Sequence, residues 1–236
     1  MRSCTDPTRG RSPLSMSCLR TALMSLTLLL AAAGHAQTSM CGSLTSSYGP
    51  FDFRTDKDKL PIVTTAHFTP EVEALIRGTT SRLPGGDIAY TLRAIPNHHG
   101  ALIAIVRLGE KEKTDKPHGS TFTVECWFDR AIRFRADDQL VRMIYADYLI
   151  KKQREADARA QLDVVKTLAA DNAFTHHNLG LLLADLKDYD AALLHAHRAM
   201  ALGLSHSALR DKLLAAGRWK DPAPADASSA ASAASQ

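Results

Sequence analysis

Histidine is the residue type with which this sequence could most readily do chemistry, because neutral imidazole is a common metal ligand. Ten histidines are present, and four lie in the segment THHNLGLLLADLKDYDAALLHAHRAMALG, as the pairs His176-His177 and His195-x-His197. Two ligands on one helix need i, i+3 or i, i+4 spacing, because successive helical residues are rotated by about 100°. No histidine in the sequence has a partner at that spacing. The sequence therefore argues against a metal site within one helix and leaves open a site assembled between helices.

Motifs of the common catalytic sites are missing from the sequence. The chain has no G-x-S-x-G nucleophile motif, no G-x-x-x-x-G-K-[ST] phosphate loop, no H-E-x-x-H zinc motif and no C-x-x-C pair. Asp185, Asp188 and Asp190 cluster, but they lack the D-x-D-x-D-G order of a calcium loop and are typical of a polar turn between helices. We therefore expect a binding protein and no enzymatic activity, with no cofactor and no metal site.

The elements that carry these residues repeat at an offset of 34 positions. At this offset NLG (178–180) falls on IYA (144–146), and Ala192 falls on Ala158. One period further back, the segment VECWFDRAIRFRADD (124–138) keeps the same register. Small residues are expected where the two helices of a hairpin approach closely, so the pattern predicts stacked helical hairpins.

This register resembles that of the tetratricopeptide repeat (TPR) family. The matching residues are Leu179-Gly180, Tyr189, Ala192 and Ala199 in the third unit, and Tyr145-Ala146, Ala158 and Val165 in the second. In the first unit the inserted segment GEKEKTDKPHGST separates the two helices. The chain departs from the family at His176 and Arg142, which replace a large aromatic residue, and the family's proline is absent after both units.

The resemblance implies an all-α fold, a right-handed α-solenoid of about three TPR helix-turn-helix units with an N-terminal helical cap and a C-terminal solvating helix. Two short helices are expected in the N-terminal extension, over 69–78 and 87–96, after an extended loop over 47–61. The expected organisation is a cleaved signal peptide (1–36), the N-terminal extension (37–95), TPR 1 with its inserted loop (96–138), TPR 2 (139–172), TPR 3 (173–206), the solvating helix (207–219) and a disordered Ala/Ser-rich tail (220–236).

The N-terminal segment predicts export to the periplasm or secretion. The apolar run ALMSLTLLLAAA (22–33) follows Arg20 and precedes GHAQ, which indicates a signal peptide cleaved after Ala36, with translation starting at Met1 or Met16. The run is too short to span a bilayer, which takes about 20 residues. Without residues 1–36 the chain has 25 basic and 24 acidic residues. This balance gives no electrostatic reason to expect a nucleic-acid partner.

Two cysteines, Cys41 and Cys126, remain after the predicted cleavage. An exported chain with two cysteines is expected to form one disulfide. Two alternatives stay open: both cysteines are unpaired, or Cys41 is lipidated. The preceding residues Thr38 and Met40 match a lipidation motif poorly, so we expect no lipid.

The resemblance also implies a function, because TPR solenoids similarly bind extended peptides or partner helices on their concave face. The residues expected to line that groove are Leu140, Met143, Asp147, Ile150 and Lys151 in the second unit, and Phe174, His177, Leu181, Ala184 and Asp185 in the third. His195 and His197 are expected to face outward on the convex side.

The predicted function is thus an exported scaffold for a protein or peptide partner in a cell-envelope assembly or export process. Three alternatives remain. The N-terminal segment or the tail could fill the groove, or the groove could be a solvated face. The chain could instead be a periplasmic metal- or haem-handling protein that uses histidines from different helices.

Overall fold

The structure is a computed structural model that describes residues 40–222. The predicted signal peptide, its cleavage after Ala36, the two candidate start residues and most of the predicted tail lie outside the described residues. Residues 40–222 contain α-helices and no β-strand, so the predicted all-α class is confirmed for this part of the chain.

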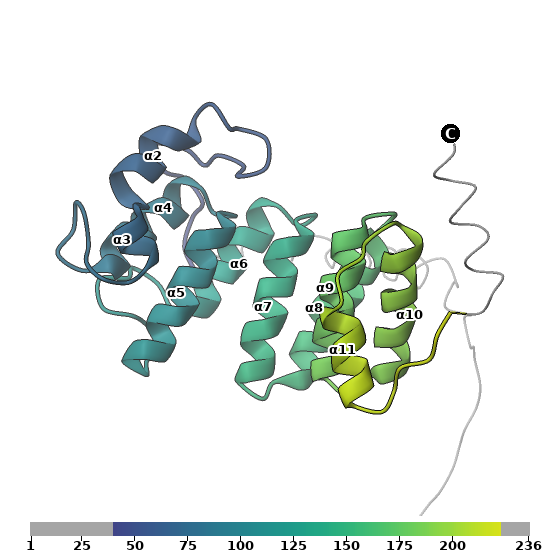
Figure 1. Cartoon of the computed structure of the whole chain (residues 1–236). Helices are drawn as coiled ribbons and strands as arrows, with labels where there is room; N and C mark the ends of the chain where they lie inside the picture. The colour runs from purple at the N-terminus through teal and green to yellow at the C-terminus, as the bar shows by residue number, and fades with distance from the viewer. Residues whose placement is uncertain (1–39, 223–236) are drawn as a thin grey trace, which may run out of the picture. The chain divides into compact units, whose positions relative to one another are not determined.

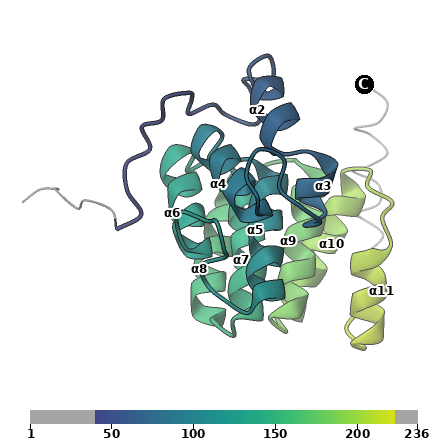
Figure 2. The same cartoon turned by 90° about the vertical axis from the view of Figure 1, so that its left-hand side faces the viewer.

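The described residues form helices α2 to α11, which follow one another from α2–α4 at one end to α10 and α11 at the other (Figure 1). Their bounds are α2 (Leu60–His67), α3 (Pro70–Glu73), α4 (Pro84–Ala94), α5 (His99–Glu112), α6 (Val124–Phe134), α7 (Gln139–Lys151), α8 (Glu155–Leu168), α9 (Ala173–Asp185), α10 (Tyr189–Ala201) and α11 (Ala208–Ala215). Helices α5 and α6, α7 and α8, and α9 and α10 pack as pairs, while α5, α7, α9 and α11 contact one another in succession. Figure 2 shows α6 and α8 on one side of α5 and α7.

The first helix of each of the last two pairs begins in the same way. Asp138 precedes α7 and accepts a hydrogen bond from the backbone N–H of Val141, and Asn172 precedes α9 and accepts one from Thr175. Asp and Asn are among the best residues at this position, because their side chains satisfy a backbone donor that the helix leaves unpaired. The two capping residues lie 34 positions apart, so the sequence repeat recurs in the local structure.

The turns within these two pairs are also alike. Gln153 and Lys187, again 34 positions apart, both adopt φ 60°. The N–H of Gln153 donates to the carbonyl of Ile150, and that of Lys187 donates to the carbonyl of Ala184. Positive φ is uncommon for residues other than glycine, so its recurrence at equivalent positions indicates the same turn in both pairs.

Small residues lie where the helices approach each other most closely. Ala158 and Ala192 are fully buried between the helices of their pairs. A side-chain carbon at Gly180 of α9 would overlap the side chain of Leu209 in α11 and would lie 3.3 Å from the carbonyl oxygen of Ala192 in α10. The glycine therefore lets α9 pack tightly against two neighbours. One apolar core runs from α3 to α11.

The N-terminal extension has three helices where two were expected. The segment expected to be an extended loop includes the start of α2, in which Pro61 occupies one of the first two helical positions. Helix α3 stops at Glu73, and Leu75 turns the chain with φ 58°, so the helix does not reach Gly78 as predicted. These differences are confined to short helices, for which the sequence pattern gives few residues to read.

Helix α4 begins earlier than expected because Pro84 starts it and the next two residues are glycines. A side-chain carbon at Gly85 would overlap the backbone oxygen of His118, which belongs to the segment inserted between α5 and α6. The absence of a side chain at this position lets the inserted segment lie directly against the first turn of α4.

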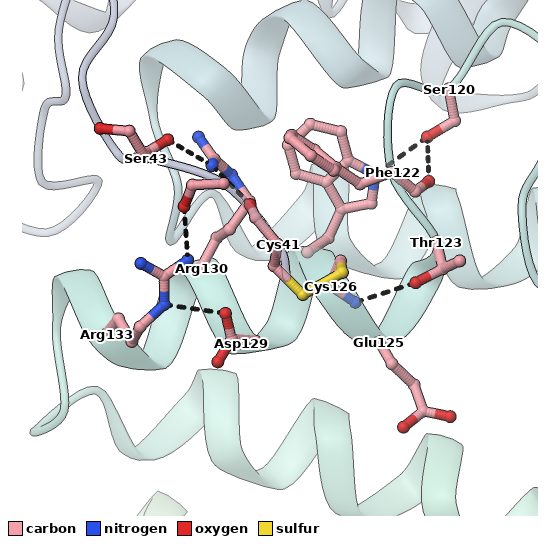
Figure 3. Close-up of a disulfide and its surroundings, with 12 residues drawn as sticks. Cys41, Ser43, Ser120, Phe122, Thr123, Glu125, Cys126, Asp129, Arg130 and Arg133 are labelled. Carbon is pink, nitrogen blue, oxygen red and sulfur yellow. Dashed lines mark hydrogen bonds and ion pairs between the residues drawn. A yellow bond between two sulfur atoms is a disulfide. The ribbon is translucent and has the colours of Figure 1, made fainter. Parts of the chain in front are cut away.

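The predicted disulfide between Cys41 and Cys126 is present (Figure 3). Arg130, one helical turn further along α6, donates hydrogen bonds from Nη1 to the carbonyls of Cys41 (3.0 Å) and Ser43 (2.6 Å). Arg133 donates to the carbonyl between them, that of Gly42 (3.0 Å). The disulfide and two guanidinium groups thus hold residues 41–43 along α6.

A helix that crosses a bilayer takes about 20 mostly apolar residues. Within residues 40–222, every helix is either too short or too polar to cross a membrane.

Candidate functional site

The exposed apolar residues of the predicted groove lie on the first turns of α7 and α9. Leu140 is 38% exposed and Phe174 is 61% exposed, and the two occupy equivalent positions. The hydroxyl of Thr175 in α9 donates to the side-chain carbonyl of Gln139 in α7 (2.8 Å), which joins these two turns. Two exposed large apolar side chains therefore lie on the first turns of adjoining helices, which this hydrogen bond joins.

Other members of the predicted groove are less accessible. Met143, His177 and Ala184 are buried, and the first and last of these belong to the apolar core. Ile150 and Leu181 are half-buried against that core. These residues support the exposed surface from below, and a partner would contact mainly the exposed side chains.

The charged members of the predicted groove are paired within the fold. Lys151 Nζ lies 3.0 Å from Asp147 Oδ2 in the same helix and 3.5 Å from Glu110 Oε1 in α5. Burial lowers the pKa of Lys151, but the hydrogen bond to Asp147 and the charge of Glu110 outweigh it, so the pKa is raised. Asp185 of α9 accepts a hydrogen bond from Lys212 of α11. These pairs bridge neighbouring helices and neutralise the charges that were expected to meet a partner.

A buried polar network joins the N-terminal extension to the helix pairs. Asn97 Nδ2 donates to Asp52 (2.7 Å) and to Asp138 (2.9 Å), both of which are buried. Asp52 also accepts from Arg54 (3.0 Å) and Arg135 (2.6 Å). Although burial raises the pKa of Asp52, these hydrogen bonds lower it well below its usual range. The network pairs each charge it buries, and we assign it a structural role.

A second polar group contains a histidine, a carboxylate and a hydroxyl. His67 Nδ1 lies 2.9 Å from Asp87 Oδ1 and 2.8 Å from Thr80 Oγ1. In a catalytic triad the carboxylate and the nucleophile bind opposite nitrogens of the imidazole, but here both lie at Nδ1. Asp87 also accepts from the backbone N–H groups of Thr79 and Ser81. The group therefore fixes the loop over 79–81 against α4.

One histidine of each pair, His176 of α9 and His195 of α10, meets the other across the helices. His176 Nδ1 of α9 lies 2.9 Å from His195 Nδ1 of α10, and His176 Nε2 lies 2.8 Å from the carbonyl oxygen of Ala170. A carbonyl only accepts, so Nε2 of His176 carries a proton and Nδ1 of neutral His176 accepts from His195. His195 was expected to face outward. It is instead half-buried against His176, and burial, with a smaller effect of His176, lowers its pKa to about 4.

The histidines also bear on metal binding. In the part of the chain that the structure describes, no three His, Cys, Asp or Glu side chains lie close enough to hold one metal ion together. His176 and His195 direct their Nδ1 atoms at each other. In this structure each Nδ1 atom is therefore engaged in a hydrogen bond with the other histidine.

A pocket of about 390 Å³ between α10 and α11 was not anticipated from the sequence. Its lining residues are Met200, Gly203, Leu204, Ser205, His206, Ser207 and Arg210. His206 connects this pocket to the exposed pair of apolar residues, because its ring packs edge-on against Phe174 at 6.0 Å between centroids. The only sequence feature that could have indicated it is the GLSHS linker between two predicted helices.

Comparison with known proteins found no matching family model, no matching curated protein and no matching solved structure. The function is therefore inferred from the chain's own residues.

Proposed function

We propose that the protein is an exported TPR scaffold that binds a protein or peptide partner on the face formed by α7 and α9, in a cell-envelope assembly or export process. The observation that carries this proposal is the recurrence after 34 residues of the same helix cap, at Asp138 and Asn172, and of the same turn, at Gln153 and Lys187. TPR proteins are built from helical hairpins of 34 residues that stack into a solenoid.

Helices α5 and α6 fit the same scheme as a first unit with an insertion. Helix α5 ends at Glu112, and the next residue, Lys113, has φ 53°, a positive value like those of Gln153 and Lys187 in the later pairs. In those pairs the second helix follows at once, whereas here residues 114–123 intervene before α6. We assign the three pairs as three units of a right-handed solenoid, covered at its ends by α2–α4 and by α11.

Export is proposed from two features. The leader-like segment before residue 37 predicts translocation, and the disulfide between Cys41 and Cys126 is a bond that persists in oxidising compartments such as the periplasm. The proposed location is therefore the periplasm or the extracellular space.

The partner is proposed to bind through apolar anchors. Leu140 and Phe174 are exposed on the first turns of adjoining helices, and the charges at the opposite ends of α7 and α9 are already paired within the protein. A few apolar or aromatic anchors usually supply most of the binding energy of an interface. We therefore place the main anchors of the partner at these two residues and give Lys151 and Asp185 a positioning role.

Capture of partners from envelope extracts tests this proposal. Phe174→Ser and Leu140→Ser should each weaken capture at least about tenfold, the loss expected for an interface anchor. Leu194→Ser on α10 is the matched control, because Leu194 is equally apolar and 68% exposed but lies on a second helix. All three variants should keep their melting temperature, since exposed substitutions change stability by about 0.5 kcal/mol or less. The proposal fails if Leu194→Ser abolishes capture and the other two variants do not affect it.

A metal- or haem-handling function is the second candidate, and the contact between His176 and His195 favours it because the two side chains come from different helices. Metal analysis of protein purified without a histidine tag separates the candidates. Stoichiometric copper, zinc or iron, lost in the His176→Gln variant, would favour the second candidate over the first.

A further inference from the structure

We propose that the pocket between α10 and α11 binds an acidic segment of a polypeptide that carries an apolar residue beside its carboxylate. The inference rests on the proposed function, because the pocket adjoins the exposed face of α9, and it adds the chemistry of the partner. Three features carry it: the volume of the pocket, its apolar floor, and the charge of Arg210 at its edge.

The pocket has the size and lining of a site for one apolar side chain and its neighbours. Its volume of about 390 Å³ lies within the range of about 300–1,000 Å³ that is usual for ligand sites. Met200 and Leu204 supply apolar surface, and Met200 is 42% exposed. An apolar side chain entering here would cover surface that the fold leaves in water.

Arg210 supplies a positive charge that the fold does not neutralise. It forms no ion pair with a carboxylate among residues 40–222, and its guanidinium carbon lies 5.3 Å from the ring centroid of Trp219. Lys212, two residues later in α11, is paired with Asp185 of α9. A guanidinium held over an aromatic ring keeps its N–H groups available at its edge, which suits a carboxylate acceptor.

A second pocket, between the ends of α5 and α7, provides a contrast. Its volume of about 250 Å³ is below the usual range, and its lining includes two lysines, Lys113 and Lys152, together with two acids, Glu110 and Asp115; Lys152 lies 2.7 Å from Asp115. The acid that would complement Lys152 is therefore supplied by the protein itself. The lining of the pocket beside Arg210 contains no acid, and Asp221, which accepts a hydrogen bond from Trp219 Nε1 (3.0 Å), forms no ion pair with Arg210; this difference selects the pocket as the docking site.

The position of the pocket makes it continuous with the proposed anchors. The ring of His206 lies between Phe174 at 6.0 Å and His177 at 5.5 Å, so it joins the first turn of α9 to the lining of the pocket. A partner segment that covers Leu140 and Phe174 can continue past His206 and place its acidic part at Arg210. The acidic group thereby fixes the direction in which the segment binds.

Binding of a peptide at the pocket can be followed by the fluorescence of Trp219. The described residues contain two tryptophans, and the other one, Trp127, is buried in α6. The probe is the acetylated and amidated peptide GSDLELDSG, and its neutral match is GSNLQLNSG. We expect the acidic peptide to cause a saturable change in Trp219 emission, while the neutral peptide binds at least about tenfold more weakly.

Variants of two arginines test whether the charge acts at the pocket. Arg210→Gln should weaken binding of the acidic peptide at least about tenfold in calorimetry. Arg218→Gln is the matched control, because Arg218 also lies over an aromatic ring, that of Tyr189 at 5.5 Å. Arg218→Gln should leave binding unchanged, whereas Arg210→Lys should retain part of it.

Four results would overturn the inference: no binding of the acidic peptide, equal binding of the neutral peptide, unchanged binding in Arg210→Gln, or equal weakening in Arg218→Gln. Capture of an envelope partner that depends on Phe174 but not on Arg210 would remove this inference and leave the proposed function intact. If capture depends on neither Phe174 nor Arg210, both this inference and the proposed function fail.

Discussion

Acidification from pH 7 to pH 5 is expected to destabilise the protein through His98. This side chain is buried, its ring lies 4.4 Å from that of Phe53 and 4.7 Å from that of Phe68, and its Nδ1 accepts a hydrogen bond from the backbone N–H of Ala101 (3.1 Å). Protonation of Nδ1 would remove this acceptor at the start of α5. Burial, with smaller effects of nearby His99 and Lys57, lowers the pKa of His98 from 6.5 to about 4.

The sign and size of the effect follow from the two pKa values of His98. Below pH 6.5 the unfolded chain binds a proton that the folded protein does not, so the free energy of unfolding falls until the pH reaches about 4. The full difference corresponds to about 3 kcal/mol, of which about 2 kcal/mol is lost at pH 5. His195, whose pKa is also lowered to about 4, and His177, whose pKa is also lowered, add losses of the same sign in this range, whereas the lowered pKa values of Asp52, Asp87 and Asp138 act only below about pH 4.

Urea unfolding at pH 7 and pH 5 measures this effect. His98→Asn removes the titrating group and keeps an acceptor that is favourable at the start of a helix. It should be less stable than the parent at pH 7, because ring contacts are lost, but its loss between the two pH values should be smaller by about 2 kcal/mol. His118→Asn, at a side chain that is 76% exposed, is the control. An equal pH dependence in His98→Asn and the parent would refute the reasoning.

Three further changes have defined outcomes. Replacing Cys41 and Cys126 by serine should lower the free energy of unfolding by about 4.5 kcal/mol in the chain-entropy model, since the bond closes a loop of 85 residues. Labelling of the denatured, unreduced parent without residues 1–36 should find no free thiol. Gly85→Ala should cost about 1–3 kcal/mol in thermal or urea unfolding, because the new methyl group meets the backbone of His118 and not a movable side chain; a neutral result would contradict this contact. Asp138→Ala should cost about 3 kcal/mol or more, since it leaves buried donors unpaired, and a smaller loss would show that water replaces the carboxylate.

The all-α class could be predicted from the sequence because small residues recur at the spacing at which helices pack against each other. Ala158 and Ala192 are both buried, and α7 and α9 begin at the predicted positions. The disulfide was predictable because the two cysteines that remain after the predicted cleavage leave one pairing. Both predictions depend on residue spacing or number, which the sequence contains directly.

Contacts between distant residues could not be read in this way. The pairing of Lys151 with Glu110 and of Asp185 with Lys212 depends on how neighbouring helices align, which spacing within one helix does not define. The expectation that His195 faces outward is wrong, because which face of α10 meets α9 depends on the packing of the two helices and not on the spacing within α10. The pocket beside Arg210 likewise forms only when the linker after α10 folds back towards α11.

The disulfide also changes what a break in the backbone would do. Cys41 and Cys126 enclose all of α2–α5 and the inserted segment in one covalent ring. Exposed loops within that ring, over 76–83 and 113–119, are the kind of segment at which proteases cut folded proteins. A single cut in either loop opens the ring but releases no fragment, because both ends remain attached through the sulfur atoms. The two parts of such a nicked chain stay covalently joined until a reductant is added. The first helices therefore remain attached to the rest even after the backbone between them is broken.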